Sequence, residues 1–301
     1  MRGIGAARCT GSQVRAAIAA PAKLNLALRV LGRRLDGYHE LDMVMARLEL
    51  ADRLELEFLP EPGDSLETVS AFRLPPGFDG PGNLILRAVR AYRERTGWPR
   101  AGVHIFLEKN IPLGGGLGGG SSDGAAILAL LNRLCPTPLS EPELTEAAVK
   151  LGADVPFFLQ PRPLARVRGI GELFSDPPDD FRRWAGRKVI LVNPVFEVST
   201  PAVFQSLGLT KGSSGNNLGP ISEVTAGEND LLTPACEAVP VLKDVRAAIE
   251  RLSPPAWGMS GSGATFWLAA GDSPAMAPAL KNAHPQWWIV ETAIAISESC
   301  S

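Results

Sequence analysis

Strand-like alternation of hydrophobic and polar residues is the clearest pattern in the first part of the chain. It is present in part of residues 43–58 and throughout residues 103–107, where apolar residues recur at every second position. Such a period of two predicts half-buried strands. Residues 16–20 and 24–31 are also apolar enough to predict two strands, one on each side of Pro21.

Helix-like spacing of apolar residues first appears after the strand predicted over residues 43–58. In residues 84–95 the apolar side chains recur every three or four positions, which predicts an amphipathic helix with Asn83 as its N-cap. The preceding residues, 61–82, are rich in proline and glycine and predict turns and loops.

Two further helices are predicted before the middle of the chain. Residues 123–134 have a helical composition. Ser140 and Glu143 form a capping-box pattern for the next helix, which is predicted to end near Gly152.

The second half of the chain shows the same two patterns at different spacings. Strands are predicted over 189–192, 265–269 and 288–296, and an amphipathic helix over 240–252. Strands that alternate with helices indicate an α/β or α+β protein. The charged, proline-containing segment 162–180 is the predicted domain boundary.

The composition of the chain excludes several functional classes of protein. The chain has 301 residues, and 30 Lys and Arg against 32 Asp and Glu give a formal charge of -2, which argues against a nucleic-acid binder that relies on bulk charge. No apolar run is long enough to predict a transmembrane helix. The four cysteines are far apart, which argues against a structural zinc site and indicates free thiols in the cytoplasm. Residues 1–14 are predicted to be a disordered extension.

A glycine cluster carries the strongest functional signal. Residues 112–123 read PLGGGLGGGSSD and lie between a predicted strand and a predicted helix. Glycine lets a ligand approach the backbone closely, and successive N–H groups, serine hydroxyls and a helix N-terminus can then surround a phosphate. The predicted phosphate-binding residues are Pro112, Gly114, Gly115, Gly116, Leu117, Gly118, Gly119, Gly120, Ser121 and Ser122.

A linker, a dinucleotide fingerprint and a Walker A loop each fit the glycine cluster less well. A flexible linker does not usually join a strand to a helix. A dinucleotide fingerprint needs an acidic residue about 20 positions later, and residues 137–139 contain none. A Walker A loop needs a lysine directly after the glycines, and Ser121 stands there instead.

Three motifs in the same order resemble those of the GHMP kinase superfamily. They are PAKLNL at 21–26, the glycine cluster, and GMSGSGATF at 258–266. This resemblance implies a two-domain α+β fold. The N-terminal domain, 15–164, would be an α/β sandwich with a left-handed-type crossover, and the C-terminal domain, 165–301, would be ferredoxin-like.

Additional segments are similar to members of the superfamily that act on a cytidine compound. They are DGYHEL at 36–41 and GADVPFFL at 152–159. The resemblance implies ATP-dependent phosphorylation of the 2-hydroxyl of a diphosphocytidyl methylerythritol, in the non-mevalonate route to isoprenoid precursors. It implies ATP and Mg²⁺, with no magnesium ligand assigned. We expect a monomer or weak homodimer with no nucleic-acid or membrane partner.

The resemblance also assigns two catalytic residues. Asp154 would accept the proton of the substrate hydroxyl or hold that hydroxyl in line, and Lys23 would pair with Asp154 and keep it ionised. The alternatives are an aspartate that only caps a helix or faces solvent, and a lysine that extends from a strand edge to solvent.

Six residues are expected to bind the substrate. Tyr38 and Phe204 would stack on the cytosine ring and His39 would hydrogen-bond its polar edge, while Asn25, Ser260 and Gly261 would lie near the substrate phosphates. Phe204 could instead be a core residue, and residues 260–263 could form only a tight turn.

Two other functions remain open from the sequence. One is a kinase of the same superfamily with another small alcohol as substrate. The other is a ligand-sensing protein that kept the fold and lost the chemistry.

Overall fold

The computed structural model describes residues 15–213, 224–271 and 275–296, and the predicted extension 1–14 lies outside them. The chain divides into two compact units, each made of separate stretches. Unit 1 consists of Met1–Ala22, Leu50–Ile111 and Gly119–Gln160, and unit 2 consists of Lys23–Glu49, Pro112–Gly118 and Pro161–Ser301. A single boundary near residue 164 does not describe this division, because strands β1 (Arg15–Arg33) and β2 (His39–Phe58) each contribute to both units.

Strand β1 is continuous through Pro21, although two separate strands were predicted. That prediction was wrong because proline fixes a φ that extended backbone tolerates and removes only one hydrogen-bond donor. β1 pairs with β2. In this strand the residues from Ala22 to Leu28 are buried, in keeping with its nearly unbroken apolar sequence.

In unit 1 the second half of β2 joins a sheet with β4 (Val103–Lys109) and β3 (Ser65–Ser70). β2 pairs antiparallel with β4 from Arg53 opposite Glu108 to Phe58 opposite Val103, and β3 pairs parallel with β4. The prediction of loops over 61–82 is therefore wrong for β3. Its short sequence has few apolar residues, and its pairing partner lies more than 30 residues away in the chain, so local pattern could not reveal it.

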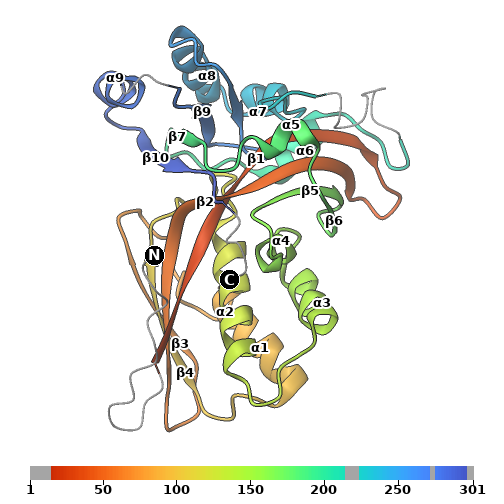
Figure 1. Ribbon diagram of the computed structural model, residues 1–301, viewed down its shortest axis with the longest axis vertical. Coiled ribbons are helices and arrows are strands. Elements are labelled where there is room, and N and C mark those ends of the chain that lie inside the picture. The colour runs from red at the N-terminus through yellow and green to blue at the C-terminus, as the bar shows by residue number, and fades with distance from the viewer. Residues whose placement is uncertain (1–14, 214–223, 272–274, 297–301) are drawn as a thin grey trace. The chain divides into compact units, whose positions relative to one another are not determined.

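The helices of unit 1 pack against one another (Figure 1). They are α1 (Leu84–Thr96), α2 (Gly119–Leu134), α3 (Glu141–Leu151) and α4 (Val155–Leu159). α2 contacts each of the other three. The side chain of Asn83 accepts a hydrogen bond from the Ile85 N–H, and Ser140 with Glu143 forms a capping box, so both predicted caps are confirmed.

Helix α2 begins four residues earlier than predicted. Gly119, Gly120, Ser121 and Ser122 form its first turn, although glycine is a poor helix former. The last part of the predicted phosphate loop is therefore a helix N-terminus, where the backbone N–H groups have no partner within the helix.

Unit 2 contains the first half of β2, which pairs antiparallel with β5 (Leu164–Gly169), and β5 pairs in turn with β6 (Leu173–Ser175). The guanidinium of Arg166 donates to both carboxylate oxygens of the buried Asp42 at 2.8 and 2.7 Å across β5 and β2. The segment 162–180 was predicted to separate two domains, but much of it forms strands within unit 2.

Unit 2 also has an antiparallel sheet in the order β10-β7-β9-β8. Its strands are β7 (Lys188–Asn193), β8 (Trp257–Met259), β9 (Phe266–Ala269) and β10 (Trp288–Ala293). Helix α8 (Val241–Arg251) packs against β9, and α9 (Met276–Ala283) packs against β10 (Figure 1). With two shorter helices inserted between β7 and α8, the chain order β7-α8-β8-β9-α9-β10 and this strand order give the ferredoxin-like arrangement that was predicted. The handedness of the crossover in the N-terminal part stays a prediction.

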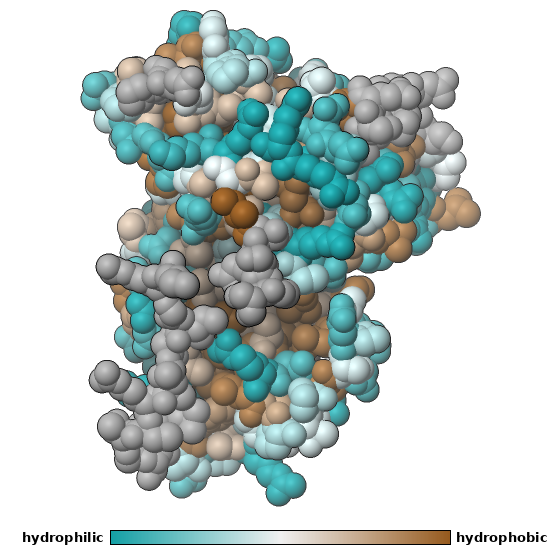
Figure 2. Space-filling model, viewed as in Figure 1, coloured by the Kyte–Doolittle hydropathy of each residue, from teal (hydrophilic) through white to brown (hydrophobic). Residues whose placement is uncertain are grey.

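The remaining helices of unit 2 are short. They are α5 (Asp179–Arg182), α6 (Thr200–Ser206) and α7 (Leu232–Ala238). Figure 2 shows hydrophilic residues over α5, in keeping with the exposed side chains of Asp179 and Asp180. Within the described ranges, no helix is both long and apolar enough to cross a membrane.

Candidate functional site

Three motifs that are far apart in the sequence meet within unit 2. The backbone N–H of Lys23, from the first motif, donates to the carbonyl of Leu117 in the glycine cluster at 2.9 Å. The N–H of Asn25 donates to Ser260 Oγ at 3.1 Å, and Ser260 Oγ donates to the carbonyl of Gly116 at 2.8 Å. Ser260 therefore links the first and second motifs.

Close contact of these segments requires glycine at two positions of the cluster. A Cβ at Gly116 would lie 2.1 Å from the carbonyl oxygen of Ser260, and Gly116 also has a positive φ of 75°. A Cβ at Gly115 would lie 2.6 Å from Asn193 Nδ2. The glycines thus allow the loop to lie directly against the third motif.

Lys23 and Asn25 lie side by side on β1 and are buried, with 4% and 2% of their surfaces exposed. Lys23 Nζ donates to Asn25 Oδ1 at 2.7 Å, and Trp267 Nε1 donates to the carbonyl of Asn25 at 3.0 Å. An added Cβ at Gly261 would lie 3.6 Å from both Lys23 Nζ and Asn25 Oδ1. The structure therefore gathers Lys23, Asn25, Ser260 and Gly261 around the start of the glycine cluster.

Unit 1 holds the other predicted residues of this group. Ser121 and Ser122 lie in the first turn of α2, and Ser122 is 1% exposed. Asp154 is the N-cap residue of α4, which packs against α2. Gly152 ends α3 and Val155-Pro156 begins α4, so Asp154 lies in the short connection between the two helices. The expected pairing of Lys23 with Asp154 stays a prediction.

The predicted cytidine-binding residues form a different aromatic contact from the expected one. The rings of His39 and Phe204 stack, with centroids 4.5 Å apart and planes 27° apart, whereas Tyr38 is 60% exposed. Partial burial and the neighbouring charge of Arg33 lower the pKa of His39. His39 is therefore mostly neutral near pH 7, and neutral imidazole can both donate and accept a hydrogen bond.

Sequence reasoning missed three polar residues that support these loops. Asn193 Nδ2 donates to Thr265 Oγ1 at 2.8 Å, and Asn229 Nδ2 donates to the carbonyls of Met259 and Gly261, each at 2.8 Å. Asn193 and Thr265 are buried. The available signal was an asparagine at the end of an apolar strand, since a buried amide needs partners.

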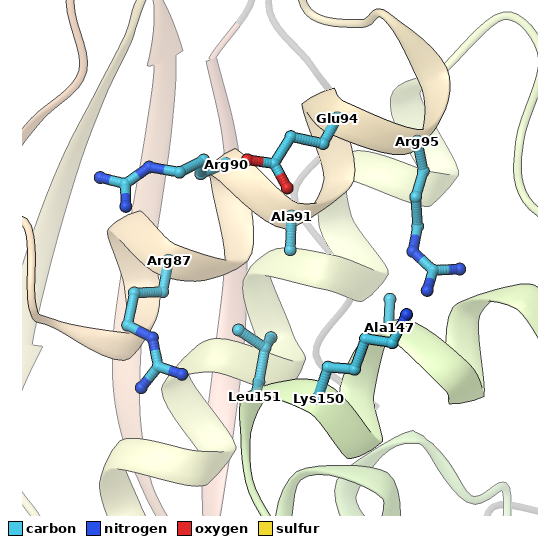
Figure 3. Close-up of a pocket in the computed structure, with 8 residues that line it drawn as sticks. All are labelled: Arg87, Arg90, Ala91, Glu94, Arg95, Ala147, Lys150 and Leu151. Atoms are coloured by element: carbon cyan, nitrogen blue, oxygen red, sulfur yellow. The ribbon is translucent and has the colours of Figure 1, made fainter.

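A hollow of about 440 Å³ between α1 and α3 contains none of the predicted site residues. Figure 3 shows Arg87 and Arg95 of α1 and Lys150 of α3 around Ala91 and Leu151. The charges of Arg95 and Lys150 are already engaged, because each lies 3.0 Å from the Glu146 carboxylate. This hollow does not resemble the predicted phosphate site.

Comparison with known proteins places these features in a family. Residues 83–161 match the family model described as GHMP kinases N terminal domain. A protein from Rhizobium etli named 4-diphosphocytidyl-2-C-methyl-D-erythritol kinase is 40% identical over 279 residues, covering 91% of this chain and 92% of its own. One of the same name from Syntrophotalea carbinolica is 41% identical over 270 residues, covering 87% and 92%.

Solved structures agree with the sequence comparison. A crystal structure of 4-(cytidine 5'-diphospho)-2C-methyl-D-erythritol kinase superposes with a TM-score of 0.73 at 36% identity, covering 92% of this chain and 99% of that one. A homoserine kinase from Cytophaga hutchinsonii superposes with a TM-score of 0.66 at 15% identity, covering 97% of each chain, which shows a shared fold. The predicted α+β fold is confirmed.

Proposed function

Because the chain belongs to the family of 4-diphosphocytidyl-2-C-methyl-D-erythritol kinases, we propose that it phosphorylates this compound. The γ-phosphoryl group of ATP would be transferred to the 2-hydroxyl of 4-diphosphocytidyl-2-C-methyl-D-erythritol. The observation that carries the proposal is the meeting of the three motifs through Lys23, Leu117, Asn25, Gly116 and Ser260.

We propose that Asp154 is the catalytic carboxylate. Phosphoryl transfer needs a hydroxyl held in line with the phosphate and neutralisation of the charge on the transferred group. Asp154 would accept the proton of the hydroxyl or orient it. Lys23 would supply positive charge, and its bond to Asn25 Oδ1 holds its ammonium in a defined position.

We propose that ATP phosphates bind to the glycine cluster and to the first turn of α2. Positive φ angles at Gly114, Gly116 and Gly118 turn the backbone of the loop, and the helix N-terminus adds donors and a favourable dipole. Mg²⁺ would accompany ATP. An ion of this kind is usually held by substrate phosphates, water and one or two carboxylates, and no protein ligand is assigned here.

We propose that His39 and Phe204 bind the cytidine part of the substrate. The two rings stack on each other, and a base could extend this stack on the outer face of one of them. Tyr38 is exposed enough to close over the other face of the base.

The test of the proposed function is ADP release in the presence of ATP, Mg²⁺ and one acceptor at a time. The acceptors are 4-diphosphocytidyl-2-C-methyl-D-erythritol, mevalonate, homoserine and galactose. We expect turnover with the cytidine compound and phosphate on its 2-hydroxyl. Turnover with one of the other alcohols alone would contradict the proposal, and ATP binding without turnover of any acceptor would favour a sensing role.

A further inference from the structure

Unit 1 contains a buried cluster of three charged residues that the sequence pattern did not indicate. Lys109 Nζ contacts a carboxylate oxygen of Asp52 and lies 2.8 Å from Oδ2 of Asp123. The side chains of Lys109 and Asp52 are 0% exposed and that of Asp123 is 3% exposed. Burial of three charges is costly in free energy, and an apolar cluster would often be more stable.

The cluster lies where the chain enters and leaves the glycine loop. Lys109 is the last residue of β4, and the second oxygen of Asp52 accepts the N–H groups of Asn110 and Ile111 at 2.6 and 2.8 Å. Asp123 lies in α2 just after its first turn. A Cβ at Gly119 would come within 2.9 Å of Lys109 Nζ, so the first residue of α2 lies directly against the ammonium.

The cluster holds one cation and two carboxylates. Burial lowers the pKa of Lys109, but Asp123 and Asp52 together outweigh that effect and raise it, so Lys109 stays charged. Burial is the largest effect on Asp123; although Lys109 opposes it, burial and the Asp52 carboxylate together raise the pKa of Asp123 to about 7. The cluster is therefore neutral when Asp123 carries a proton and has one excess negative charge when it does not.

Two polar atoms at this point are buried without a protein partner. They are Oδ1 of Asp123 and Oγ of Ser122, among the residues that the structure describes. A buried polar atom without a hydrogen bond is destabilising, so atoms of this kind suggest a place that a ligand or water completes. Both belong to the beginning of α2, where we have proposed that phosphate binds.

We propose that Asp123 is a positioning residue and that ATP binds preferentially to the protein in which Asp123 is protonated. This inference rests on the proposed function, because ATP is the occupant of the loop. An ionised Asp123 would leave an excess negative charge beneath the turn that receives an anionic phosphate, and like charges at this range repel in a poorly solvated site. By linkage, bound phosphate would in turn raise the affinity of Asp123 for its proton.

Few other charged groups affect the protonation of Asp123. Lys109 from β4 and Asp52 from β2 are the charged residues that act on Asp123. Helix α1 approaches Gly120 and Gly124 through the apolar side chain of Leu84. Helix α4 contributes the buried residues Val155, Pro156, Phe157 and Phe158, with Asp154 as the titratable group at its N-cap.

The test compares the Kd for Mg·ATP, measured by calorimetry without acceptor, in the wild type and in Asp123→Asn over pH 6–9. Asparagine keeps the shape of the side chain and leaves Lys109 paired with Asp52, so the variant has a neutral cluster at every pH. ATP itself titrates in this range, but its contribution is the same for both proteins. We expect the two Kd values to be similar at pH 6 and the wild-type value to be roughly tenfold weaker than that of the variant at pH 9.

A Kd ratio that stays constant from pH 6 to pH 9 would overturn the inference while leaving the proposed function intact. Absence of ATP binding to the wild type at every pH would overturn both. Asp79→Asn, which removes an exposed carboxylate of unit 1, is the matched control and should follow the wild-type profile. If Asp123→Asn does not fold, carbon NMR of aspartate-labelled wild type decides: the pKa of the Asp123 carboxyl should rise on addition of ATP, and an unchanged value would overturn the inference.

Discussion

Substitution of Asp154 should separate phosphoryl transfer from ATP binding. It lies at the N-cap of α4, and no hydrogen bond from its side chain caps that helix. In Asp154→Asn the side chain keeps its shape but can no longer accept a proton. We expect kcat to fall by about 100-fold or more, the usual contribution of a positioned acid or base, while the Kd for ATP remains close to that of the wild type.

The measurement for Asp154 is steady-state kinetics combined with calorimetric ATP binding. Asp179→Asn is a suitable control, because the side chain of Asp179 is 98% exposed on α5 and has no proposed role. A kcat close to that of the wild type would remove Asp154 from the mechanism.

Substitutions of Phe204 and Tyr38 are expected to affect the cytidine substrate and ATP differently. Stacking of a base on an aromatic ring contributes about 1–3 kcal/mol, so Phe204→Ala should raise the KM for the cytidine substrate by roughly 5- to 150-fold. The KM for ATP should change little. Tyr38→Ala tests the second face of the base in the same assay, and equal effects on both KM values would contradict the proposed cytidine site.

At the scale of elements, the glycine cluster is not uniform. Gly116 has a positive φ and no room for a Cβ, whereas Gly120 lies in α2 and a Cβ there would meet only Leu84 Cδ1 at 3.9 Å. Gly116→Ala should therefore lower both the melting temperature and turnover with ATP, because the backbone at Ser260 must move to make room for the added Cβ. Gly120→Ala should keep or raise stability, by up to about 1 kcal/mol, since alanine is the better helix former.

Thermal unfolding and kcat/KM for ATP, measured on both glycine variants, check this expectation. The pair is matched, because both residues belong to the same predicted phosphate-binding motif. If Gly116→Ala has the same melting temperature as the wild type, the close contact with Ser260 is not needed for stability.

The boundaries of the helices and strands show where the local sequence was sufficient to predict the structure. Caps at Asn83 and Ser140 have side chains that bond within one helical turn, so the pattern located both helix starts. β3 and the start of α2 were missed. β3 depends on pairing with β4, and the glycines at the start of α2 contradict their own helix propensity.

For the molecule as a whole, a net charge of -2 supplies no long-range attraction for anionic substrates. Binding would depend on short-range donors at the loop and on Lys23, which are screened less than surface charges. Raising the salt concentration from about 50 to about 300 mM should therefore lower kcat/KM for ATP by no more than about threefold. Potassium acetate in place of potassium chloride controls for specific anion binding, and a tenfold fall with both salts would indicate electrostatic steering instead.

The sequence by itself was sufficient to predict the α+β class, the three motifs and the family to which the chain belongs. These features reside in short stretches whose residue types are dictated by local geometry, as with glycine where backbone approaches backbone. Only the tertiary structure revealed that Ser260 links Asn25 to Gly116, that His39 stacks on Phe204, and that Lys109 is buried between Asp52 and Asp123. Each of these contacts joins residues from separate segments of the chain. Their hydrogen bonds and ion pairs become strong only when folding removes the interacting groups from water.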